Sequence, residues 1–215
     1  MSALSDTQLM GASQLSGWTR RHVLSHIANN ARALMNLLHW ARTGIETPMY
    51  ASPEHRNADI EAGAALPAAA LRADALASAQ ELSGAVAAMS EAAWDGAIRT
   101  ALGRAVTGAE VPWMRVREVW VHGVDLGAGA TFADVDGDVA AALLAEAARG
   151  LAGRADCPAV RLEPDAGEVL VIGPATSVPD QVRGTIGALA AWVLGRSAGD
   201  GLASRGPLPA LPRWL

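Results

Sequence analysis

A segment near the middle of the chain combines apolar and ionisable residues in one helical pattern. It reads VPWMRVREVWVHGVDLG over residues 111–127, with a proline in its first turn and a glycine at its end. Proline is favoured at the first helical position, and glycine commonly ends a helix. On a helix, polar side chains spaced by three, four and three residues lie along one stripe. The side chains of this stripe are Arg115, Glu118, His122 and Asp125.

Apolar residues flank the polar stripe on both sides, among them Trp113, Val116 and Val124. If the stripe faces the interior of a bundle, its charges must be paired or bound to a metal, because an unpaired buried charge is costly. Glu118 and His122 are four residues apart, so both side chains can reach one ion. They suit Zn²⁺ or a similar divalent metal, although such a pair more often forms a plain hydrogen bond or no contact.

The remaining metal ligand has to come from another helix. Four further histidines are available, namely His22, His26, His39 and His55. His26 borders the apolar face of a helix predicted over residues 16–43, and His22 lies one turn earlier on the same side. Position slightly favours His26 but leaves His22 open, and a single histidine at an apolar border is usually a hydrogen-bonded core residue.

Hydrophobic periodicity predicts three helices in the first part of the chain, over residues 16–43, 67–90 and 112–126. Residues 44–66 contain two prolines and mixed charge and are expected to form a long connection, of a kind that is often functional. Residues 91–110 are interrupted by glycines and are expected to hold a loop and a short extended piece.

The pattern changes after residue 127, where short strands alternate with helices. Helices are predicted over residues 138–152 and 179–196, strands over 159–164 and 168–173, and an extended tail at the Pro-rich end. The predicted fold class is therefore α+β. A helical bundle over residues 1–130 is followed by a small α+β domain over residues 131–215.

Composition excludes several classes of function. All 17 basic residues are arginine, which rules out a Schiff-base lysine or a P-loop lysine. The net charge is −5, with no basic stripe for nucleic acid and no apolar run of the roughly 18–20 residues that a membrane span requires. The single Cys157 cannot form an internal disulfide and is expected to be inert and buried. Without a recognisable secretion signal, the chain is expected in the cytoplasm.

Residues 15–64 and 111–127 together resemble the mycothiol-dependent maleylpyruvate isomerase family, whose first domain is DinB-like. The resemblance rests on Gly-Trp-Thr, on the spacing of eight positions from Trp18 to His26, and on the Arg-x-x-Glu-x-x-x-His-x-x-Asp helix. Near the end, Trp-x-x-Gly-Arg and LPALPRWL look like the small second domain of that family. The resemblance covers nearly the full length, although the second domain looks short and its sheet is expected to be reduced.

The resemblance implies a zinc ion bound by one histidine of the first helix and by the Glu/His pair of the later helix. Residue by residue, these ligands are His26, Glu118 and His122, so the motif selects His26 over His22. The substrate-binding arginine of the family corresponds to Arg196 in WVLGR.

Three acidic residues are secondary candidates for the site. Asp59 and Glu61 match an Asp-Ile-Glu segment of the family and could bind the polyol of the thiol cofactor, or could simply cap a helix. Asp125 could orient a metal ligand, or could form an ordinary network with Arg115.

The family chemistry fits these groups. Zinc with three protein ligands keeps one open position, and a thiol bound there becomes a thiolate. Mycothiol thiolate can add to the cis double bond of maleylpyruvate and leave after rotation, giving fumarylpyruvate with the thiol regenerated. The developing enolate needs positive charge, and the dicarboxylate needs arginine anchors, of which Arg196 is one.

Two other functions remain open from the sequence. The same zinc thiolate could serve a thiol S-transferase that acts on electrophiles, or the protein could be a non-catalytic metal- or thiol-binding module. The second domain and Arg196 favour the isomerase. The thiol could be glutathione or another small thiol instead of mycothiol, the metal could be another divalent ion, and a monomer or weak dimer is expected.

Overall fold

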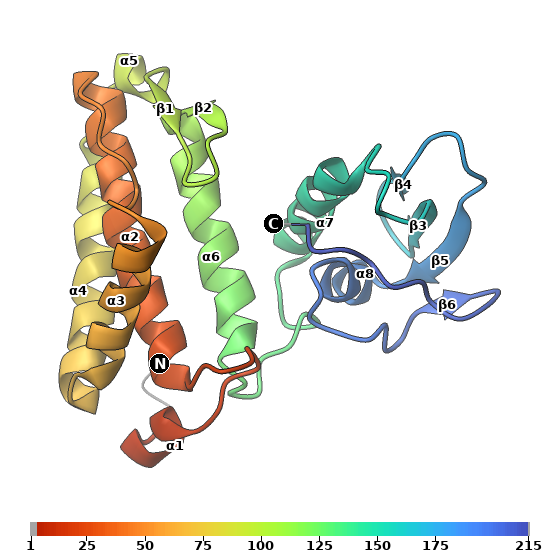
Figure 1. The fold of residues 1–215 in the computed structure, drawn as a ribbon, viewed down its shortest axis with the longest axis horizontal. Helices are drawn as coiled ribbons and strands as arrows, with labels where there is room; N and C mark the ends of the chain where they lie inside the picture. The colour runs from red at the N-terminus through yellow and green to blue at the C-terminus, as the bar shows by residue number, and fades with distance from the viewer. Residues whose placement is uncertain (1–3, 215) are drawn as a thin grey trace. The chain divides into compact units, whose positions relative to one another are not determined.

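The structure is a computed structural model that describes residues 4–214. The chain divides into two compact units, of which the first ends at Gly129 and the second begins at Ala130 (Figure 1). A helical unit followed by a unit with a sheet confirms the predicted α+β class. Of the helices in the described part of the chain, none has the length and apolar character needed to cross a membrane.

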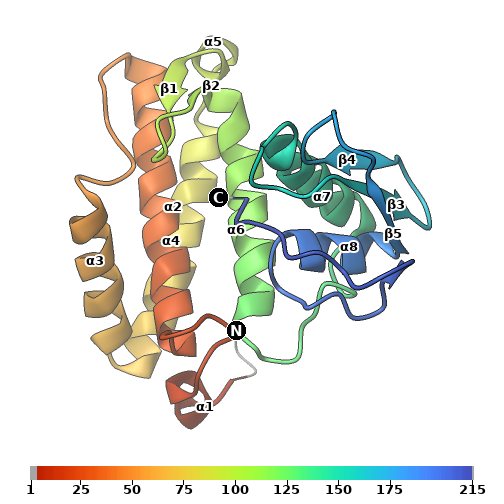
Figure 2. The same ribbon diagram turned by 45° about the vertical axis from the view of Figure 1, so that its right-hand side comes forward.

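The first unit is a bundle built around one long helix. Helix α2 (Arg20–Thr43) contacts α3 (Pro53–Ala65), α4 (Ala68–Ala87) and α6 (Val111–Asp125), as both views of the ribbon show (Figures 1 and 2). The short helices are α1 (Asp6–Met10), α5 (Glu91–Trp94) and the 3-10 turn η1 (Gly108–Glu110). Strands β1 (Ala97–Arg99) and β2 (Ala105–Thr107) pair as an antiparallel hairpin. Strand β1 is the short extended piece that the sequence indicates, whereas β2 lies in the segment predicted to be a loop.

Helix α2 begins and ends where its sequence dictates. Thr19 forms a capping box with His22, in which the side chain of each residue bonds the backbone of the other. Gly44 ends the helix with φ 72°, a left-handed conformation that glycine adopts without strain. Between these ends, Leu34 and Leu37 are fully buried among apolar residues of the neighbouring helices. The helix starts four residues later than predicted, because residues 16–19 form the turn that leads into it.

Helix α3 was not expected, because residues 44–66 were predicted to be a connection. The side chain of Ser52 accepts a hydrogen bond from the backbone N–H of His55, and Pro53 occupies the first turn. Only Ile60 and Ala64 of this helix are buried, so its hydrophobic periodicity is too weak to reveal it. Its capping signals, Ser52 and Pro53, were nevertheless present in the sequence.

The second unit contains a four-stranded mixed sheet in the order β4-β3-β5-β6. The elements are α7 (Gly137–Leu151), β3 (Val160–Pro164), β4 (Leu170–Ile172), β5 (Asp180–Gly184), α8 (Ile186–Val193) and β6 (Ala203–Ser204). Strand β3 pairs antiparallel with β4 and parallel with β5. Helices α7 and α8 pack against each other, and both contact strands of the sheet.

The predicted helix over residues 179–196 is wrong in its first half. Residues 180–184 form β5, in which Val182 is fully buried and its neighbours are exposed, an alternation typical of a strand. Thr185 then caps α8 by accepting a hydrogen bond from the backbone N–H of Ala188. The strand was missed because its pairing partner, β3, lies about twenty residues earlier in the chain, so local periodicity does not reveal it.

Candidate metal centre

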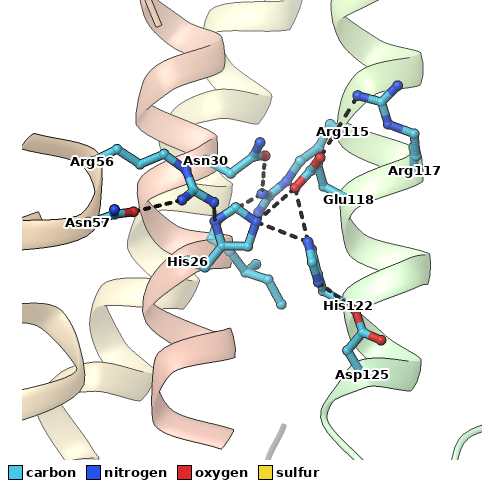
Figure 3. A network of polar contacts seen from close by, with 10 residues as sticks. His26, Asn30, Arg56, Asn57, Arg115, Arg117, Glu118, His122 and Asp125 are labelled. Carbon is cyan, nitrogen blue, oxygen red and sulfur yellow. Dashed lines mark hydrogen bonds and ion pairs between the residues drawn. The ribbon is translucent and has the colours of Figure 1, made fainter. Parts of the chain in front are cut away.

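Three side chains from two helices of the first unit converge on one point. Nε2 of His26, on α2, lies 3.0 Å from Oε2 of Glu118 and 3.0 Å from Nε2 of His122, both on α6 (Figure 3). One ligand atom from each residue lies within 4.8 Å of the other two. Two imidazole nitrogens and one carboxylate oxygen are a donor set that zinc accepts, so the residues present fit a divalent metal.

The second nitrogen of His122 has a fixed partner. Its Nδ1 lies 2.8 Å from Oδ2 of Asp125, one turn further along α6. Asp125 is fully buried, and its backbone carbonyl accepts a hydrogen bond from the N–H of Gln14. A carboxylate behind a histidine holds the ring and places the proton on Nδ1, which leaves Nε2 free to bind a metal.

The contacts within the cluster determine the charge of each of its three side chains. Burial would raise the pKa of Glu118, but hydrogen bonds with His122 and His26 outweigh it and hold that pKa well below its usual range. Burial lowers the pKa of His26 and favours its neutral form. Burial acts in the same direction on His122, but hydrogen bonds to Asp125 and Glu118 prevail and raise its pKa. Glu118 is therefore an anion, which is the form in which a carboxyl group binds a metal.

Arg115 connects the two helices. Its Nη1 donates to the backbone carbonyl of Ile27 at 2.7 Å and to Oδ1 of Asn30 at 3.0 Å, both on α2 (Figure 3). Arg115 therefore bonds α2. Asn30 is buried although it is polar. In the sequence, an asparagine at an apolar position of the helical pattern is the signal that indicates a buried hydrogen-bond partner.

Trp18 and His22 lie beside His26. The Trp18 ring stacks on His22 with centroids 6.2 Å apart and lies 5.7 Å from the ring of His26. His22 uses Nδ1 to cap α2 and turns Nε2 toward Glu61, at 3.3 Å. His22 therefore stands outside the three-residue cluster, and His26 is the histidine of α2 that faces Glu118.

In the first unit, Asp59, Glu61 and His39 stand outside the three-residue cluster. Asp59 pairs loosely with His55, with 3.7 Å between Oδ2 and Nε2. Both Asp59 and Glu61 stand inside α3, whose cap is Ser52, so the alternative that they cap a helix is wrong. His39, a further histidine of the first helix, is exposed. In the second unit, Cys157 is buried, and Arg196 follows α8 and donates from Nη1 to the carbonyl of Leu194.

Sequence reasoning missed Arg56 and Tyr50. Arg56, in the first turns of α3, places Nη2 3.4 Å from Nδ1 of His26 and Nη1 3.1 Å from Oδ1 of Asn57 (Figure 3). Its guanidinium carbon lies 5.7 Å from the centre of the Tyr50 ring. Burial raises the pKa of Tyr50 and keeps its hydroxyl protonated. Neither residue could be placed near His26 while residues 44–66 were taken as a connection.

Comparison with known proteins shows the family to which the chain belongs. Residues 1–127 match the family model described as the mycothiol maleylpyruvate isomerase N-terminal domain. The crystal structure of the mycothiol-dependent maleylpyruvate isomerase is 39% identical, with a TM-score of 0.93 over 99% of this chain and 89% of that chain. A histidine-to-alanine mutant of that enzyme matches equally well. No curated protein sequence gave a match. The chain belongs to the mycothiol maleylpyruvate isomerase family.

Proposed function

We propose that this protein is a mycothiol-dependent maleylpyruvate isomerase, in which His26, Glu118 and His122 bind Zn²⁺. The observation that carries the proposal is the convergence of these three side chains from α2 and α6 within 4.8 Å. The 39% identity to the mycothiol-dependent maleylpyruvate isomerase, over almost the whole chain, supports the same reaction.

The donor set suits a catalytic metal. Three protein ligands leave one position of a tetrahedral zinc open, whereas structural zinc sites have four protein ligands. Two neutral imidazoles and one carboxylate leave a net positive charge at the metal, which favours an anionic fourth ligand. A metal bound here would convert a small thiol into a thiolate, which adds reversibly to an electron-poor double bond and so permits rotation about it.

The protein residues around the cluster hold it in place. Asp125 fixes the His122 ring through Nδ1, so that Nε2 points at the cluster. Arg115 bonds Asn30 and Ile27 of α2, which keeps α2 and α6 in register at the level of the ligands. The cluster itself is largely screened from water, because His26 is buried and the side chains of Glu118 and His122 are 18% and 15% exposed. Partial burial strengthens the electrostatic effects on which this chemistry depends.

Two further roles are proposed. Arg196 would bind one carboxylate of the substrate, since arginine offers a permanent charge and two parallel donors. Its support is the Trp-x-x-Gly-Arg motif at residues 192–196. Glu61 would bind hydroxyl groups of the thiol, supported by its contact with His22 and the stacking of His22 on Trp18 beside His26. Asp59, also predicted to bind the thiol, lies two residues before Glu61 on α3.

The test is to incubate purified protein with maleylpyruvate, with and without mycothiol, and to follow the ultraviolet spectrum and the products. Conversion to fumarylpyruvate with catalytic mycothiol supports the isomerase. Consumption of one thiol per substrate supports the S-transferase, and bound zinc without any reaction supports a binding module. Glutathione in place of mycothiol shows which thiol the site accepts.

Arg196→Ala provides an internal test of the substrate-binding role. The variant should keep its zinc, because Arg196 is not one of the three proposed ligands. It should lose turnover, because the substrate would lose an anchor for one carboxylate. An unchanged kcat/KM would remove Arg196 from the site. Cytoplasmic location, for which the single Cys157 is the support, stays a prediction that cell fractionation would check.

A further inference from the structure

A cavity of about 440 Å³ lies in the first unit, within the range of small-molecule sites. Its wall is formed by the end of α2, by the segment that leads into α3 and by the turn of the β1–β2 hairpin. Apolar and aromatic side chains, such as Trp40, Tyr50 and Leu102, supply much of the lining, and Arg56 and Arg99 supply positive charge. None of the residues that line this cavity has a role in the proposed reaction described above.

Some arginines of the bundle pair with acidic residues, whereas the two arginines of the cavity form no such pair with the residues that the structure describes. Arg32, Arg72 and Arg104 each form an ion pair with an acidic residue. Within residues 4–214, Arg56 and Arg99 have no such pair, and Arg99 donates only to the carbonyl of Gly103, at 2.9 Å. The acidic residue of the lining, Glu46, pairs with neither arginine. The cavity therefore presents positive charge that protein carboxylates do not neutralise.

Arg56 belongs both to the cavity and to the surroundings of the metal cluster. Its Nη2 faces Nδ1 of His26 at 3.4 Å, while Nε2 of the same ring faces Glu118 and His122. When Nε2 of a neutral histidine binds a metal, its Nδ1 carries the proton and becomes a donor. Arg56 has only donors, so in that state the Arg56–His26 contact cannot be a hydrogen bond.

Metal-binding histidines almost always give their second N–H to a carboxylate, a carbonyl or water. His122 has Asp125 in that place, at 2.8 Å. His26 has the guanidinium of Arg56 instead. An oxygen of an external carboxylate that lies beside this contact, and not on the line between the two nitrogens, would accept from both Nη2 of Arg56 and Nδ1 of His26. It would give His26 the acceptor that Asp125 gives His122.

We propose that Arg56 binds a carboxylate of the substrate at the edge of this cavity, beside His26. Arg99 adds positive charge to the same cavity and steers small dicarboxylates into it. The proposal rests on the proposed isomerase activity, and it assigns a carboxylate anchor that a dianionic substrate needs. Arginine suits this place because its charge is permanent and its donors match the two oxygens of a carboxylate.

The test compares Arg56→Gln, Arg56→Lys and Arg99→Gln with Arg104→Gln as the matched control. Arg104 lies next to the same hairpin turn but pairs with Glu110 and does not line the cavity. Binding of maleate, a dicarboxylate that lacks the ketone, is measured on the zinc-loaded protein by calorimetry. Zinc content, the Kd for mycothiol and the KM for maleylpyruvate are measured in parallel.

Arg56→Gln should weaken maleate binding and raise the KM for maleylpyruvate by about tenfold or more, as expected for the loss of a charged hydrogen bond. Zinc content and the Kd for mycothiol should stay as in the wild type. Arg56→Lys should recover part of the loss, Arg99→Gln should weaken maleate binding less than Arg56→Gln does, and Arg104→Gln should bind like the wild type.

Wild-type maleate binding in Arg56→Gln, or no maleate binding by the wild-type protein, would overturn the proposal. If Arg56→Gln does not fold, undiminished maleate binding in both Arg56→Lys and Arg99→Gln would overturn it. Failure of the two proposals is distinguishable. Turnover with an unchanged KM in Arg56→Gln removes only the role of Arg56, whereas Arg56-dependent maleate binding without turnover removes only the isomerase activity.

Discussion

Nε2 of His26 and Nε2 of His122 lie 3.0 Å apart, although 96 positions separate them in the chain. The two rings meet edge to face, with centroids 4.5 Å apart and planes at 90°. Oε2 of Glu118 lies 3.0 Å from His26 and 3.4 Å from His122. The packing of α2 against α6 thus brings together three ligand atoms that no local stretch of sequence contains.

Removal of either histidine should remove the metal. His26→Ala and His122→Ala should each purify with much less than the roughly one zinc per chain expected of the wild type, because two remaining ligands hold zinc weakly. Zinc is measured by elemental analysis of the dialysed proteins. His22→Ala is the matched control, since His22 faces Glu61, and this variant should keep its zinc. Equal zinc in all three variants would contradict the assignment.

Asp125 should matter to the metal without touching it. Asp125→Asn weakens the interaction that holds the His122 ring, and loss of such a partner typically lowers metal affinity by about 10–100-fold. The Kd for zinc is measured by competition with a chelator. Asp134→Asn changes an exposed aspartate that bonds Thr131 and should bind zinc like the wild type. If both variants matched the wild type, Asp125 would have no part in metal binding.

Zinc affinity should rise with pH through the neutral range. Hydrogen bonds to Asp125 and Glu118 raise the pKa of His122, so a proton competes with zinc at a higher pH than for an ordinary histidine. Below that pKa, each unit of falling pH should weaken zinc binding about tenfold, since one proton must leave. His26 and Glu118 have lowered pKa values and add no competing proton near neutrality. A Kd that is constant from pH 6 to pH 8 would refute this account.

The stability of the bundle should depend on the buried face of α2. Leu34 is fully buried, and Leu34→Ala should lower the free energy of unfolding by about 2–5 kcal/mol. Leu76 on α4 is 56% exposed, so Leu76→Ala should change it by no more than about 0.5 kcal/mol. Urea unfolding followed by circular dichroism measures both. Equal losses in the two variants would show that α2 is not the centre of the core.

The sequence predicts the candidate site better than it predicts the fold around it. Glu118 and His122 share one helix, so their spacing alone brings them together. Position on α2 favours His26 over His22 only slightly, because both lie on one side of the helix, and the family motif makes the choice. The structure shows the physical difference, which is that His22 caps its own helix and cannot also face α6.

Besides the short helices α1 and α5, the sequence does not predict β5 and α3. Strand β5 pairs directly with β3, although β4 lies between the two in the sequence. Helix α3 buries only Ile60 and Ala64. Neither element produces a strong local pattern in the sequence. Strand β5 depends on backbone pairing with β3, and the buried face of α3 has too few apolar residues to show a helical period. Without α3, the contact of Arg56 with His26 could not be anticipated.

The most direct test of the account is the turnover of maleylpyruvate with mycothiol before chelation, after chelation and after zinc is restored. The wild-type protein should lose activity with its metal and recover it when zinc returns, whereas His26→Ala should stay inactive throughout. Fumarylpyruvate formation is followed by its ultraviolet absorbance. Full mycothiol-dependent activity in metal-free wild-type protein would contradict the account.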